Sequence, residues 1–90
     1  MFVAVSCDLA SDDHRRAVYG LLRQYGFVRV LGSLYECTTL TTAYLARLKR
    51  DLDKVTDSYD KLRIYQYPMD QTLVITSMEE KRWRKLKVKA

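Results

Sequence analysis

The sequence contains few of the residues that interrupt regular structure. Only three glycines and one proline occur among its 90 residues, whereas disordered and low-complexity segments are usually rich in such residues. We therefore expect a single small domain that folds nearly from end to end, because a chain of this length can build only one modest core.

Long apolar runs are missing as well. No stretch approaches the roughly 18 residues that a membrane-spanning helix needs, and the first residues lack the basic region of a signal peptide and reach an acid at Asp8. The sequence therefore predicts a cytoplasmic protein.

Metal-binding and nucleophilic motifs are scarce. Cys7 and Cys37 are the only cysteines and have no further Cys or His at ligand spacing nearby, which argues against a zinc site or a redox pair and favours buried thiols. The single histidine, His14, is expected to be solvated, although it is also a candidate general base near Asp8. No glycine-rich phosphate loop is present.

Positive charge is concentrated at the C-terminal end. Residues 1–78 carry ten basic and nine acidic side chains, whereas residues 79–90 carry six basic and two acidic ones, so the tail supplies most of the net charge of +5. We divide the chain into a domain at 1–78 and a basic C-terminal tail at 79–90. An anionic partner is expected for the tail.

The pattern of apolar residues predicts five strands and two helices. Helices are expected at about 12–25, with Ser11 to Asp13 at its start and Gly26 at its end, and from Thr41 or Thr42 to about 55. Strands are expected at 2–5, 27–31, 34–38, 62–67 and 72–76. On the second helix, Lys49 and Asp53 have the four-residue spacing of an ion pair.

This order is β-α-β-β-α-β with an additional C-terminal strand, which is the α+β plan of ferredoxin-like folds. The additional strand, with Leu73, Val74 and Ile75, needs a neighbouring edge. We expect a homodimer formed by strand exchange at the sheet edge, with these three residues in its interface. The alternative is a strand that folds back onto its own sheet.

Several short motifs share the spacing of a known family. They are Asp8 after a hydrophobic strand, Tyr25-Gly26, Arg29-Val30, Ser33, Tyr35 and Glu36. With these residues, and with the order of elements over residues 1 to about 77, the chain resembles the CRISPR-associated Cas-two family, the second Cas core protein. It departs from the family at Cys7, where an aromatic residue is usual, at Leu31, where Gln is usual, and in its basic tail.

The resemblance implies an antiviral role in spacer acquisition, as a homodimer that holds duplex DNA and bridges the Cas-one integrase. The alternative is an endonuclease that uses Mg²⁺ and acts on single-stranded RNA or duplex DNA, with Asp8 of both protomers as the metal-binding catalytic carboxylates. A third reading is a ribonuclease toxin similar to the VapD family. From the residues alone, Asp8 could equally cap backbone amides after its strand.

Basic residues supply the candidate nucleic-acid contacts. Arg15 and Arg16 lie in the first turn of a helix, where free backbone amides already favour phosphate. The tail adds Lys81, Arg82, Arg84 and Lys85, and Trp83 among them is the candidate anchor for the partner integrase. A solvated tail without either role is the remaining alternative.

Overall fold

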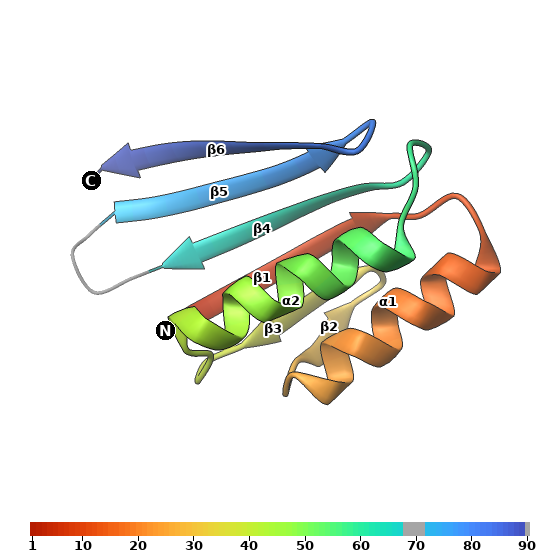
Figure 1. Ribbon diagram of the computed structural model, residues 1–90. Coiled ribbons are helices and arrows are strands. Elements are labelled where there is room, and N and C mark those ends of the chain that lie inside the picture. The colour runs from red at the N-terminus through yellow and green to blue at the C-terminus, as the bar shows by residue number, and fades with distance from the viewer. Residues whose placement is uncertain (68–71, 90) are drawn as a thin grey trace.

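The computed structural model describes residues 1–67 and 72–89 and contains one antiparallel sheet with two helices on one of its faces (Figure 1). The elements are β1 Phe2–Asp8, α1 Asp12–Gln24, β2 Val28–Leu31, β3 Leu34–Cys37, α2 Thr42–Val55, β4 Lys61–Tyr67, β5 Thr72–Glu79 and β6 Arg82–Lys89. The strand order is β2-β3-β1-β4-β5-β6. The predicted α+β class and β-α-β-β-α-β order are confirmed.

Local signals determine both helices. Ser11 accepts a hydrogen bond from the His14 amide at the start of α1, and Thr41 accepts one from the Tyr44 amide at the start of α2. Gly26 follows the end of α1 with a φ of 89°, a conformation that favours glycine. Both helices thus begin where the capping residues predict.

The core lies between the helices and the sheet. Alternate residues of β1 (Val3, Val5 and Cys7) point toward the helices and pack against Val18 and Leu22 of α1. Leu45, Leu48 and Leu52 form the buried stripe of α2. Burial raises the pKa of the Cys7 thiol to about 12, which keeps it protonated. The expectation of buried thiols is confirmed for both cysteines.

The sheet extends further than the sequence predicted. The segment expected as a basic tail forms β6 over Arg82–Lys89, and the boundary placed at residue 78 falls inside β5. A two-residue turn at Glu80 and Lys81, both with positive φ, joins β5 to β6. The tail therefore continues the sheet, because its alternating side chains suit a strand.

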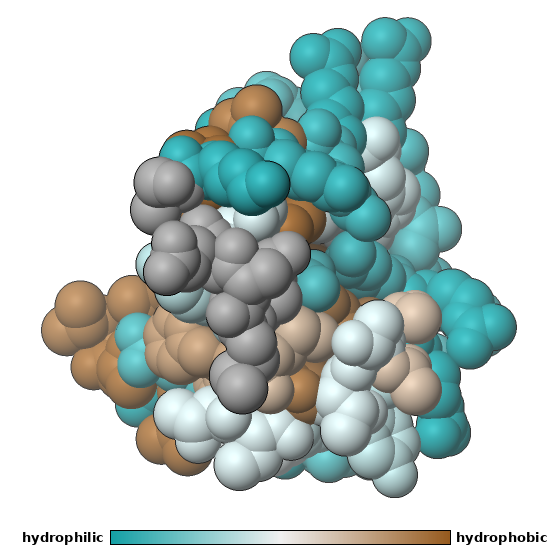
Figure 2. Space-filling model, turned by 90° about the vertical axis from the view of Figure 1, so that its left-hand side faces the viewer, coloured by the Kyte–Doolittle hydropathy of each residue, from teal (hydrophilic) through white to brown (hydrophobic). Residues whose placement is uncertain are grey.

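No helix within residues 1–67 and 72–89 covers the other face of the sheet. Phe2, Tyr67, Leu86 and Val88 have large exposed apolar surfaces on this open face. Figure 2 shows hydrophobic surface along its left-hand margin, on the side of the sheet away from the helices, and hydrophilic surface at the top, where β6 lies. Neither helix in the described part of the chain has the length and apolarity to span a bilayer.

Candidate nucleic-acid and metal-binding site

Asp8 lies at the end of β1, exposed on the open face of the sheet. The strand register places Asp8 beside Lys61 of β4. Lys61 lies beside Glu79 of β5, and Glu79 lies beside Arg82 of β6. The Lys61 ammonium is 3.4 Å from a Glu79 carboxylate oxygen. The result is a row across four strands in which acidic and basic side chains alternate.

A hollow of about 240 Å³ is lined by Asp8, Lys61 and Glu79 of this row. Arg63 and Ser77 from the next row of the same face line it as well. Mg²⁺ takes an octahedron of oxygen ligands and is usually held by one or two carboxylates, while waters and substrate phosphates complete the octahedron. Of the two carboxylates in this hollow, Glu79 is paired with Lys61, so one chain offers Asp8 alone as an unpaired oxygen ligand among the described residues. The cationic groups Lys61 and Arg63 suit a phosphate group better.

Arg15 and Arg16 lie at the start of α1, as predicted, and each forms an ion pair with an aspartate of the same helix. Arg15 forms an ion pair with Asp12 and donates a hydrogen bond of 2.9 Å to the Leu9 carbonyl, directly after Asp8. Arg16 forms an ion pair with Asp13. The Arg15 guanidinium lowers the pKa of Asp12 through a hydrogen bond and through its charge. Exposed ion pairs of this kind contribute little free energy, so a phosphate group can replace Asp12 and Asp13 as the partners of the two arginines.

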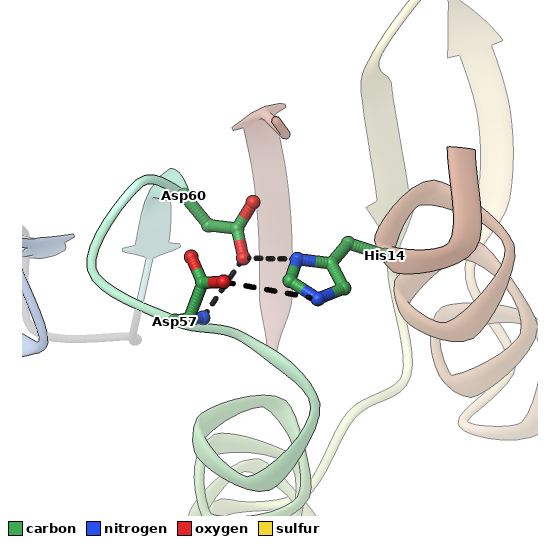
Figure 3. A group of neighbouring side chains, drawn as sticks. All are labelled: His14, Asp57 and Asp60. Carbon is green, nitrogen blue, oxygen red and sulfur yellow. Dashed lines mark hydrogen bonds and ion pairs between the residues drawn. The ribbon is translucent and has the colours of Figure 1, made fainter. Parts of the chain in front are cut away.

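Three polar side chains that lie far apart in the sequence meet beside the start of α1 (Figure 3). His14 Nδ1 lies 2.6 Å from an Asp60 carboxylate oxygen, and His14 Nε2 lies 4.0 Å from Asp57. Asp60 is fully buried and also accepts hydrogen bonds from the Ala10 and Asp57 amides at 2.8 and 2.9 Å. This cluster ties the loop before β4 to the loop before α1.

The hydrogen bonds to Asp60 decide its ionisation. Burial by itself raises the pKa of Asp60, but hydrogen bonds from the Ala10 and Asp57 amides and from His14 outweigh burial and lower that pKa. Asp60 is therefore ionised at neutral pH. The prediction that His14 is solvated is wrong for one ring nitrogen, because Nδ1 is bound to this carboxylate.

The same three side chains could hold a metal ion, since one ligand atom from each lies within 4.8 Å of the others. A mixed nitrogen and oxygen donor set suits a borderline cation such as Zn²⁺ better than Mg²⁺. Sequence reasoning missed Asp57 and Asp60, which lie in a polar loop without a ligand motif. His14, which binds Asp60, lies 46 residues away in the sequence, so no local spacing of residues indicates that the two side chains meet.

Lys81 and Trp83 anchor β6 to the end of α2. The Trp83 indole donates a hydrogen bond of 2.9 Å to Asp53, and the Lys81 ammonium lies 3.0 Å from the same carboxylate and 3.1 Å from the Thr56 carbonyl. The hydrogen bond from Trp83 lowers the pKa of Asp53 most, and the hydrogen bond from Lys81 lowers it further. The expected pair of Lys49 with Asp53 is therefore replaced by contacts from Lys81 in the β5–β6 turn and from Trp83 in β6.

The remaining basic residues of β6 are divided between the two faces of the sheet. Register places Arg82 and Arg84 on the open face, beside Glu79 and Ser77, and Lys85 on the helix side, beside Thr76. Of these three β6 residues, Arg82 and Arg84 thus share a face with Asp8. The end of β1, the start of α1 and the β5–β6 turn all lie at the right-hand end of Figure 1.

The residues predicted for the dimer interface lie on a strand that is paired on both sides. β5 pairs with β4 on one side and β6 on the other, so the single chain shows the strand folded onto its own sheet. Strand exchange through β5 would require it to leave one of these neighbours. Leu73 and Ile75 are partly exposed on the open face, whereas Val74 is buried toward the helices.

The fold and these sites together define a small α+β protein with a ferredoxin-like arrangement, a cationic rim and an exposed carboxylate, Asp8, at the end of β1. The family model for CRISPR associated protein Cas2 matches residues 1–85. The chain belongs to this family, which is the Cas-two family of the sequence resemblance. No curated protein and no solved structure matches the chain significantly. Membership of the family implies a role in CRISPR adaptation.

Proposed function

We propose that this chain is the spacer-acquisition subunit that forms a homodimer, binds duplex DNA and bridges the Cas-one integrase. The observation that carries the proposal is the match to the Cas2 family over residues 1–85, which includes every element up to the middle of β6. The family match also favours this role over that of a toxin related to VapD.

The distribution of charge supports a duplex-binding role. Arg15 and Arg16 at the start of α1 and Arg82 and Arg84 on the open face of β6 provide cations at the same end of the sheet. Contacts of this kind bind phosphates without reading sequence, which suits a protein that must accept many different fragments.

The apolar half of the open face supports dimerisation. Tyr65 and Ile75 share a cross-strand row with Leu86, and Phe2 and Val88 lie toward the same end. A second copy that covers this apolar area would remove it from water. This packing leaves β5 between its own neighbours, unlike the strand exchange that the sequence suggested.

A spacer-integration assay with the co-purified Cas-one integrase tests the proposal. We expect the Asp8→Ala variant to retain integration, because a structural subunit needs no chemistry at Asp8. The double variant Arg15→Gln and Arg16→Gln should bind duplex DNA about tenfold more weakly at low salt, and Arg23→Gln on the same helix provides the matched control.

The alternative function is the Mg²⁺-dependent endonuclease that uses Asp8 of both protomers on single-stranded RNA or duplex DNA. Its specific support is the exposure of Asp8 at the end of β1, where a second copy could approach. Loss of integration in Asp8→Ala, with dimerisation and integrase binding intact, would contradict the structural role and favour this enzyme.

A further inference from the structure

A second cationic hollow lies on the helix side of the sheet, between α2 and β6, away from Asp8. This groove has a volume of about 500 Å³. Lys49, Arg50 and Lys54 of α2 line one side, and Lys85 of β6 lines the other. Trp83 and Thr76 also contribute to its surface. None of the α2 residues stood out in the sequence as a binding residue.

The charges in this groove are unbalanced. Asp53 is the only carboxylate among its lining residues, and it is already bound to Lys81 and Trp83. Lys49 and Lys85 form no ion pair within the part of the chain that the structure describes. Burial, and then the nearby charge of Lys85, lower the pKa of Lys49. An anion between the two ammonium groups would relieve their repulsion.

Thr76 provides an independent indication of a ligand. Thr76 is one of the residues that line the groove and is only 4% exposed, and its buried hydroxyl has no hydrogen-bond partner among the described residues. Buried hydroxyl groups nearly always have a partner. An anion in the groove would accept a hydrogen bond from this hydroxyl.

The cations on this side of β6 continue beyond the groove. Lys85, Lys87 and Lys89 alternate along the strand and point to the same face. Alternate residues of a strand are about 6.8 Å apart, which is comparable with the separation of successive phosphates in a single nucleic-acid strand. A hollow of about 500 Å³ has the size of a small-molecule site and can accept the backbone of one or two nucleotides.

We propose that the groove between α2 and β6 binds the phosphodiester backbone of a single nucleic-acid strand, with Lys49 and Lys85 around one phosphate and the Thr76 hydroxyl donating to it. Lys87 and Lys89 extend this contact along β6. The site is separate from the duplex-binding residues at the start of α1, and it does not depend on the proposed role in spacer acquisition.

Fluorescence anisotropy with a labelled oligothymidylate of about ten nucleotides tests the proposal on the full chain at several salt concentrations. The double variant Lys49→Gln and Lys85→Gln should bind about tenfold more weakly at low salt, and the slope of log K against log salt should become shallower by about 0.7 for each phosphate that the variant no longer neutralises. Arg23→Gln, which removes one exposed charge from α1, should match the unchanged chain.

The Thr76→Val variant tests whether the Thr76 hydroxyl binds a ligand or is only buried. Because the hydroxyl has no partner among the described residues of the free chain, Thr76→Val should raise the unfolding temperature and also weaken oligothymidylate binding about threefold. A higher unfolding temperature with unchanged binding would overturn the role of Thr76.

Three other results would overturn the proposal as a whole. They are a failure of the unchanged chain to bind oligothymidylate at low salt, an equal effect of Arg23→Gln and the double lysine variant, and tighter binding of an oligoglutamate peptide of the same length at Lys49 and Lys85. The last result would assign the groove to an acidic protein segment. Duplex binding through Arg15 and Arg16 is measured separately, so the proposal for the groove and the proposal for duplex binding are tested independently of each other.

Discussion

Asp60 is a buried carboxylate that connects two loops distant in sequence. Replacement by Asn retains the size but removes the charge that the Ala10 and Asp57 amides and His14 stabilise. We expect Asp60→Asn to lower the free energy of unfolding by about 1–3 kcal/mol at pH 6. Urea denaturation measures this change, and Asp57→Asn, at an exposed position, should cost less than about 1 kcal/mol.

The same carboxylate predicts a pH dependence. The pKa of Asp60 is lower in the folded chain than its unfolded value of about 3.9. Its contribution to stability is therefore complete above about pH 4 and is lost as the pH falls through the folded pKa. Urea denaturation between about pH 6 and pH 3 should show a steeper loss of stability for the unchanged chain than for Asp60→Asn. Parallel profiles would contradict this assignment.

At the scale of elements, β6 depends on its contacts with α2. Asp53→Ala removes the acceptor for the Trp83 indole and for Lys81. We expect this change to lower the free energy of unfolding by about 1–2 kcal/mol and to speed hydrogen exchange at the amides of β6 more than at those of β1. Lys54→Ala, an exposed change on the same helix, provides the control.

The sheet pairing also determines how the basic segment should be tested. Removal of β6 would expose the edge of β5 and favour association with other chains. Substitution of single lysines and arginines leaves the strand in place. Changes in nucleic-acid binding can then be attributed to charge rather than to a damaged sheet.

At the scale of the whole molecule, the open face favours self-association. Size-exclusion chromatography with light scattering should show a dimer at micromolar concentration, and Ile75→Lys with Leu86→Lys should convert it to a monomer, because both changes place charge in the apolar half of that face. Circular dichroism should show that the fold is retained. A folded monomer of the unchanged chain would contradict the dimer.

The sequence by itself determined both helices, the first five strands and most of their ends. Ser11, Gly26 and Thr41 are local signals, and they cap the helices where predicted because capping depends on neighbours within a few residues. The strand β6 carried a local signal too, in the alternation of Leu86 and Val88 with lysines, but its high charge resembles a solvated tail.

The tertiary structure decided which polar side chains bind one another. Asp53 had a nearby candidate partner in Lys49, yet it binds Lys81 and Trp83, because the β5–β6 turn brings them to the end of α2. His14 and Asp60 meet only through the packing of two loops. Local spacing does not encode such contacts, because each depends on the path of the whole chain between the partners.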